Sequence, residues 1–132
     1  MKIEYQQESS FKLDEMLALY RASGINRPTD DSARMAIMLA SSNLLISARS
    51  DGNLVGLARC LTDKAYVVYI CDLLVDKALQ QQGIGKALLA AVQQATGPQV
   101  QQLLRSAPSA MQYYPAVGFT AIDNGFHIQR QC

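Results

Sequence analysis

The sequence predicts an α/β (α+β) fold, a mixed and mainly antiparallel sheet flanked by helices. Two early stretches of the chain carry apolar residues at helical spacing. Three apolar, β-branched-rich stretches follow, and an Asp-Gly turn joins the first two of them. The third leads through a polar, glycine-containing loop into another helical pattern. At 132 residues the chain has the length of one domain, 1–132, with a sizeable core.

The composition narrows the class of protein. Hydrophobic residues make up 49% and charged residues 17%, as in compact globular domains. A net charge of +1 favours neither nucleic acid nor an anionic membrane as a partner. The start of the chain lacks the apolar core of a signal peptide. The scattered cysteines (Cys60, Cys71 and Cys132) indicate no disulfide framework and no metal site. We therefore expect a cytoplasmic protein without nucleic-acid, membrane or metal partners.

The first 40 residues predict an edge strand and two helices. Residues 2–6 alternate weakly, and Ser9 or Ser10 can cap a helix that ends at Gly24. The apolar stripe of this helix consists of Leu13, Met16, Leu17 and Tyr20. After a loop at 24–29, a second helix begins at Asp30 or Asp31. The residues that it should bury are Met35, Met38 and Leu39.

The rest of the chain predicts six more strands and two helices. Strands 43–49 and 54–61 form a hairpin across Asp51-Gly52, and strand 66–75 follows a turn at 62–64. The helix after it ends at Thr96-Gly97-Pro98. A strand at 100–105 and a short helix within 108–116 come next. Two short strands, 119–122 and 126–130, should close the fold around an Asp123-Asn124-Gly125 turn.

The junction after strand 66–75 predicts a phosphate-binding loop. It consists of Gln80, Gln81, Gln82, Gly83, Ile84, Gly85 and Lys86. The first N–H groups of a helix lack partners within the helix, and its dipole favours an anion there. Glycines remove the Cβ atoms that would keep a phosphate away.

Spacing excludes two common nucleotide motifs at this loop. An NTPase P-loop needs Gly five residues before Gly-Lys and Ser or Thr after it, where this chain has Gln80 and Ala87. A dinucleotide GxGxxG motif needs a small third residue, where this chain has Leu88.

Gln80-x-x-Gly83-x-Gly85 resembles the acetyl-CoA signature of the GNAT N-acetyltransferase superfamily. Tyr113-Tyr114-Pro115-Ala116-Val117-Gly118-Phe119 resembles that family's Phe-Tyr-x-x-x-Gly-Phe segment, and the order of elements agrees over most of the chain. The resemblance implies a single-domain GNAT-like fold, with acetyl-CoA as co-substrate and no metal. It also implies transfer of an acetyl group to a primary amine by direct transfer in a ternary complex.

The resemblance assigns roles to residues on the acetyl-CoA side. The main chain of Leu73, Leu74 and Val75 would pair with the pantetheine arm like an added strand, helped by a bulge near Asp72. The N–H groups from Gln81 to Lys86 would bind the pyrophosphate. Ala107 stands where the family often has an Asn that contacts CoA, so that contact is expected to be missing.

The same resemblance places Tyr114 as the general acid, because a phenol with a pKa near 10 stays protonated at neutral pH. The alternative for both tyrosines of this segment is a core aromatic with a satisfied hydroxyl. Asp72, the only carboxylate on strand 66–75, is the candidate general base. It could instead orient substrate or cap backbone, and a chain of waters could take the proton. Asn26 and Arg27 lie in the loop that borders the family's acceptor site, although they also suit an ordinary solvated loop.

Several alternatives stay open from the sequence. A non-catalytic acyl-CoA-binding module would share the fold, and another acyl-CoA could replace acetyl-CoA. The acceptor amine could belong to a small metabolite, a peptide or a protein. The oligomeric state is also open, a homodimer included.

Overall fold

The computed structural model describes residues 2–132, and its central feature is a five-stranded sheet in the order β1-β2-β3-β4-β5. Neighbours from β1 to β4 pair antiparallel, and β5 pairs parallel with β4. The mixed, mainly antiparallel sheet predicted from the sequence is therefore confirmed. The strands are β1 (Glu4–Gln7), β2 (Leu44–Ser50), β3 (Asn53–Thr62), β4 (Val67–Val75) and β5 (Gln101–Leu104). The helices are α1 (Leu13–Ser23), α2 (Ser32–Ser41), η1 (Lys77–Leu79), α3 (Ile84–Thr96), η2 (Pro108–Ala110) and α4 (Tyr113–Ala116).

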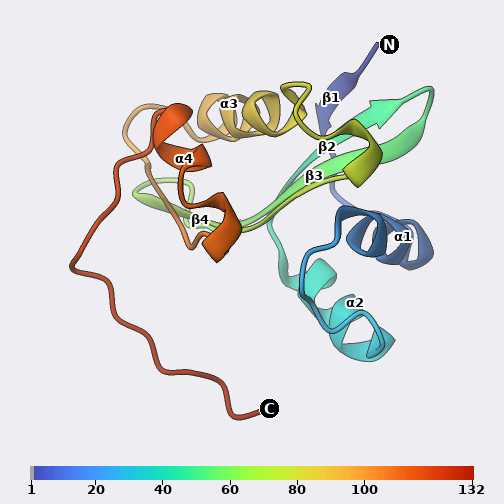
Figure 1. Cartoon of the computed structure of the whole chain (residues 1–132), viewed down its shortest axis with the longest axis horizontal. Helices are drawn as coiled ribbons and strands as arrows, with labels where there is room; N and C mark the ends of the chain where they lie inside the picture. The colour runs from blue at the N-terminus through green and yellow to red at the C-terminus, as the bar shows by residue number, and fades with distance from the viewer. Residues whose placement is uncertain (1) are drawn as a thin grey trace.

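Helices cover both faces of the sheet. Figure 1 shows α3 on one side and α1 with α2 on the other. Successive side chains of β3 point to opposite faces of the sheet, because side chains alternate along a strand. Leu57 lies in the core under α1, and Ala58 lies in the core under α3. The α3 core includes Leu88 and Val92, both fully buried. The sheet thus separates two hydrophobic cores.

Local sequence signals set most of the element ends. Gly24 ends α1 in the left-handed conformation at φ 79°, and the Asp31 side chain accepts a hydrogen bond from the Arg34 backbone N–H at the start of α2. The predicted cap of α1 at Ser9 or Ser10 is wrong, because α1 starts later with Lys12 at the N-cap position and no side-chain cap. No side chain caps this helix, but the acidic side chains of Asp14 and Glu15 in its first turn interact favourably with the positive end of the helix dipole.

The two strands predicted at 119–122 and 126–130 are also wrong. No strand lies between 119 and 132, where the chain forms an irregular segment that pairs with no strand (Figure 1). Phe126 and Ile128 are 98% and 99% exposed. A strand forms only where a neighbouring strand accepts its backbone hydrogen bonds, and the alternating pattern of a short segment does not supply that neighbour. None of the helices within residues 2–132 combines the length and the apolar character needed to cross a bilayer.

Candidate functional site

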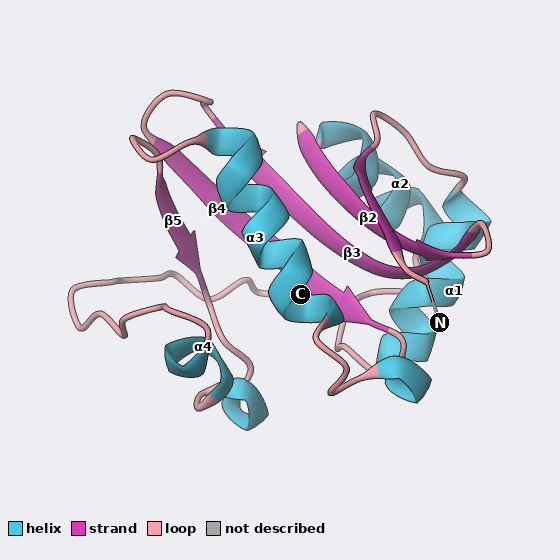
Figure 2. Cartoon of the chain, turned by 90° about the horizontal axis from the view of Figure 1, so that it is seen from above, coloured by secondary structure: helices cyan, strands magenta, loops and turns pink. Residues whose placement is uncertain are grey.

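The edge of β4 opens halfway along the strand. β5 pairs with β4 only from Val67 to Ile70, where Ile70 faces Leu104. From there β4 continues to Val75 bonded only to β3, and β5 diverges towards α4 (Figure 2). The backbone of Leu73 to Val75 on the β5 side therefore has no strand partner within the described chain. This is the kind of edge to which an extended ligand arm can add as a strand.

A β-bulge turns β4 over just before this open edge. Ile70 pairs with Cys60 and Asp72 pairs with Arg59, so Cys71 is an extra residue on β4. Because of the extra residue, Ile70 packs in the α3 core whereas Leu74 packs under α1. The bulge predicted near Asp72 is confirmed. Its effect is to direct the Asp72 carboxylate towards α1.

Asp72 accepts hydrogen bonds from three side chains although it is only 2% exposed. The Tyr20 hydroxyl donates to Oδ2, and Nε atoms of the two arginines donate at 2.7 Å, Arg27 to Oδ1 and Arg59 to Oδ2. Burial, followed by the nearby carboxylate, raises the pKa of Tyr20, so its hydroxyl remains a hydrogen-bond donor. Two guanidinium groups share one carboxylate, which leaves the cluster with one net positive charge.

The structure brings the predicted loop residue Arg27 to this carboxylate, 45 positions away in the sequence. Its other nitrogens donate to the carbonyl oxygens of Asn26 and Cys71. Sequence reasoning missed Arg59 and Tyr20 as partners of Asp72. Arg59 carried a usable signal, because it is the only charged residue between 54 and 61, as Asp72 is between 66 and 75.

The predicted phosphate-binding loop leads into α3 as expected. Gly83 at φ 86° and Gln81 at φ 66° are left-handed, and Ile84 is the first helical residue. The Gln80 side chain donates to the Val75 carbonyl at 3.0 Å and so closes the loop. The Ala87 N–H bonds the Gly83 carbonyl, so the N–H groups from Ile84 to Lys86 precede the intrahelical bonds and are left for a ligand.

Tyr113 lies over the start of α3. A Cβ atom placed on Gly85 would meet the Tyr113 hydroxyl oxygen at 2.8 Å. The absence of a side chain at Gly85 therefore permits the close approach of this hydroxyl to the start of α3. Glycine at this position fits a group that must come within contact distance of the backbone.

Tyr114 packs beside its neighbours in two edge-to-face contacts. The ring centroids are 5.2 Å from Tyr113 and 5.7 Å from Phe119. Burial, with a smaller contribution from Tyr113, raises the pKa of the Tyr114 phenol. The phenol is thus protonated at neutral pH and can donate a proton. Burial likewise raises the pKa of the Cys71 thiol, so Cys71 is not an activated nucleophile.

A cleft of about 1110 Å³ lies where β4 and β5 diverge. Of the predicted site residues, it brings together Asn26, Arg27, Asp72, Leu73, Val75, Gln80 and Tyr114. Leu74 is outside its lining and is 1% exposed, so only the main chain of Leu74 is available there. The residues from Gln81 to Lys86 also lie outside the cleft lining. Arg34, Arg59, Lys77 and Arg105, which sequence reasoning did not select, contribute to it.

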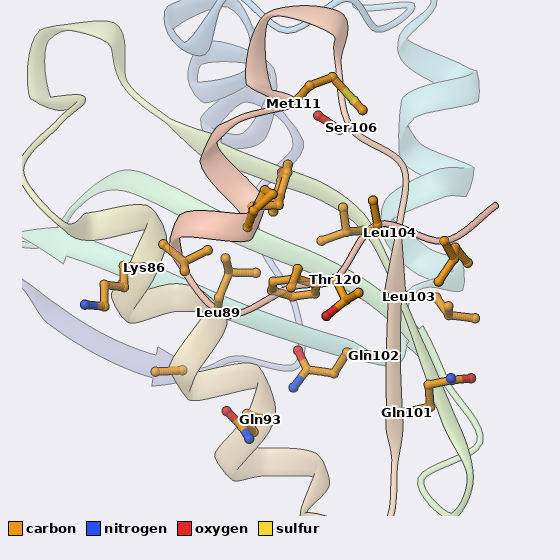
Figure 3. Close-up of a pocket in the computed structure, with 18 of the residues that line it drawn as sticks. Lys86, Leu89, Gln93, Gln101, Gln102, Leu103, Leu104, Ser106, Met111 and Thr120 are labelled. Carbon is orange, nitrogen blue, oxygen red and sulfur yellow. The ribbon is translucent and has the colours of Figure 1, made fainter.

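A second hollow of about 850 Å³ lies between α3, β5 and the segment after η2 (Figure 3). Gln102 points into it from β5, and its Oε1 is buried without a hydrogen-bond partner in the described chain. Of the predicted site residues only Lys86 and Tyr114 line it. The two hollows therefore share Tyr114.

Comparisons with known proteins identify the family and the fold. Residues 16–129 match the family model described as an acetyltransferase (GNAT) domain. A GNAT-family acetyltransferase of Streptococcus pneumoniae superposes with a TM-score of 0.72 at 26% identity, covering 98% of this chain and 100% of that one. A probable acetyltransferase of Staphylococcus aureus gives 0.81 at 18% identity, with the same coverage. An aminoglycoside N-acetyltransferase in complex with a bisubstrate analogue of CoA and acetylneamine gives 0.74 at 21% identity, covering 100% of both chains. A search of the curated proteins found no match.

Proposed function

Because the chain belongs to the GNAT acetyltransferase family, we propose that it transfers an acetyl group from acetyl-CoA to a primary amine. The transfer is direct, within a ternary complex. The observation that carries the proposal is the open edge of β4, which leads through η1 and the loop 80–83 into a glycine-containing helix N-terminus. We also propose a cytoplasmic location, since the three cysteines are free and suit a reducing compartment.

The residues present fit acetyl-CoA at this place. The main chain from Leu73 to Val75 has no strand partner on the β5 side and can pair with the amide groups of the pantetheine arm, although the Val75 carbonyl already accepts a hydrogen bond from Gln80. The first N–H groups of α3 and the helix dipole suit the pyrophosphate, and the Tyr113 hydroxyl lies against Gly85 at the same place. The turn from Gln80 to Gly83 connects the β4 side of the proposed site to the start of α3. The contact that an Asn would make is absent at Ala107, which lines the cleft.

The proposed reaction breaks the thioester C–S bond and forms an N–C bond. The amine must be neutral to attack, and the carbonyl oxygen must be stabilised as it gains negative charge. The departing thiolate takes a proton, which Tyr114 supplies from its phenol. Water accepts the proton that the amine loses.

Asp72 is proposed to act through Arg27. Both of its carboxylate oxygens already accept hydrogen bonds, and proton acceptance by Asp72 would disrupt at least one of them. The geometry favours the alternative left open by the sequence, in which this carboxylate orients a substrate-binding group. Arg27 and Asn26 then border the acceptor amine in the cleft.

Two measurements test the proposed function. Acetyl-CoA and CoA should each raise the melting temperature, whereas NAD and ATP at equal concentration should do far less because neither has a pantetheine arm. Release of free thiol from acetyl-CoA, followed with a panel of amines, should show turnover. A larger shift with NAD or ATP would contradict the CoA site. Stabilisation by CoA without turnover on any amine would instead indicate a non-catalytic acyl-CoA-binding module.

A further inference from the structure

The cleft lining has a large excess of positive over negative side chains, whereas the two are nearly balanced over the whole chain. The sequence has 12 lysine and arginine residues and 11 acids. Six of the cations line the cleft but only one of the acids, Asp72. The cations are Arg27, Arg34, Arg59, Lys77, Arg105 and Arg130. A cleft with one sign of charge concentrates molecules of the opposite sign.

The single carboxylate does not neutralise this charge. Arg27 and Arg59 both pair with Asp72, so the pair of arginines keeps one net positive charge. Asp72 is buried by its partners, with a side chain that is 0% exposed, and offers no free oxygen to an incoming cation. The cleft floor therefore attracts anions and repels ammonium groups.

Two arginines on the α1–α2 side have donors free for a ligand. The Arg27 side chain is 32% exposed and carries five N–H donors. Its hydrogen bonds to Asp72, Asn26 and Cys71 use three of them, and Nη2 also lies 2.7 Å from Asp72, so at least one donor is left. Arg34 lies in the first turn of α2, exposed, and its guanidinium has no hydrogen bond or ion pair within residues 2–132. A guanidinium binds carboxylate or phosphate through paired N–H groups.

These charges lie apart from the groups proposed to bind the pyrophosphate. That site is the start of α3, and the residues from Gln81 to Lys86 are not among those lining the cleft. Arg27 and Arg34 belong instead to the loop and helix over the opposite face of the sheet. Their charge is therefore available to the acceptor.

We propose that the acceptor is an amine that also carries an anionic group, a carboxylate or a phosphate, held by Arg27 and Arg34. This rests on the proposed acetyltransferase function and specifies its substrate class. It also separates this chain from the aminoglycoside N-acetyltransferase of the same fold that is complexed with an analogue of CoA and acetylneamine, because neamine carries several amino groups. A cleft with six cations would repel such a polycation.

The test uses pairs of amines that differ only in the anion. Amino acids are compared with their amides, ethanolamine phosphate with ethanolamine, and neamine serves as the polycation. Removing the carboxylate lowers the pKa of the amine and so increases its neutral fraction, which by itself would favour the amide. We expect KM for the anionic member of at least one pair to be lower by ~10-fold or more, as one charge-assisted bond provides. The two kinds of pair distinguish carboxylate from phosphate.

Variants connect this preference to the arginines. Arg34→Gln, at an exposed position, should raise KM for the anionic amine ~10-fold and leave KM for the neutral partner and for acetyl-CoA unchanged. Arg27→Gln should raise KM for the anionic amine by a similar factor, and a smaller change in KM for the neutral partner is expected because Arg27 also borders the acceptor amine. Its folding is checked by the melting temperature because the substitution also removes a partner of Asp72. Lys12→Gln, an exposed cation outside the cleft, is the matched control and should change none of these values.

The outcomes separate the inference from the function on which it rests. Turnover that favours amides, free ethanolamine or neamine would overturn the inference and leave the acetyltransferase function standing. An anion preference that survives both arginine substitutions in folded protein would also overturn it. The absence of thiol release with every amine would overturn the function, and the inference with it.

Discussion

Replacing Tyr114 by Phe removes one hydroxyl group and separates a proton donor from a packing residue. The ring stays between Tyr113 and Phe119, at centroid distances of 5.2 and 5.7 Å, so nearly all of its buried area is kept. We expect the free energy of unfolding to change by no more than about 1 kcal/mol, the net value of one hydrogen bond. A larger loss would mean that the hydroxyl is held by the fold.

The effect on turnover should be much larger. A general acid contributes about 10²- to 10⁴-fold, so the loss of the Tyr114 proton should raise the barrier by about 2.7–5.4 kcal/mol. The kcat should fall by that factor, with KM for acetyl-CoA almost unchanged. The raised pKa of Tyr114 keeps the wild-type acid protonated, so kcat should not decline from loss of this proton below about pH 10.

Tyr113→Phe is the matched control, and the structure gives it a different expected result. The Tyr113 hydroxyl lies beside Gly85 at the start of α3, where the pyrophosphate is proposed to bind. Its loss should therefore alter KM for acetyl-CoA and leave kcat unchanged. The assay is steady-state thiol release for both variants, with melting temperatures alongside. If Tyr114→Phe turns over as fast as the wild type, or if Tyr113→Phe is the variant with the low kcat, the assignment of the acid is refuted.

Two further predictions concern the phosphate-binding loop and stability in acid. Gly85→Val should weaken acetyl-CoA binding by at least about 2 kcal/mol, because its Cβ would displace the Tyr113 hydroxyl and obstruct the helix N-terminus. Calorimetric titration of the folded variant checks this, and unchanged affinity would exclude the site. The paired hydrogen bonds of Arg49 lower the pKa of Glu8 to about 2, so Glu8 should add about 1–2 kcal/mol of stability above pH 4.5 that is lost as the pH falls towards 2. Urea unfolding of Glu8→Gln should show a deficit at pH 7 that disappears near pH 2, whereas Glu4→Gln, at an exposed position on β1, should show none.

The parts of the fold predicted correctly are those that adjacent residues determine. Asp51-Gly52 provides the positive φ angles of its turn, and Asp31 supplies the acceptor that starts α2. The loop before α3 could be predicted for the same reason, since a glycine and a helical pattern are close in sequence. Each of these features needs only a few neighbouring side chains to form.

The parts that could not be predicted depend on distant partners. The strands expected at 119–122 and 126–130 have suitable residues, but no neighbouring strand is there to bond them. The cluster around Asp72 required knowing that a bulge at Cys71 turns the carboxylate towards Tyr20. The family resemblance predicted a bulge near Asp72, but the face to which the bulge turns the carboxylate depends on the register of two strands, and one-dimensional spacing does not encode that register.

The separation of the two cores by the sheet has a consequence for how this protein can evolve. The arginines proposed to select the acceptor stand on the α1–α2 side, whereas the helix proposed to bind the phosphates is anchored in the core of the other face. Substitutions at well-separated sites without shared partners combine additively. A lineage can therefore change its acceptor through mutations around Arg27 and Arg34 without loss of the acetyl-CoA site. The same scaffold can in this way supply new specificities while the chemistry is inherited intact.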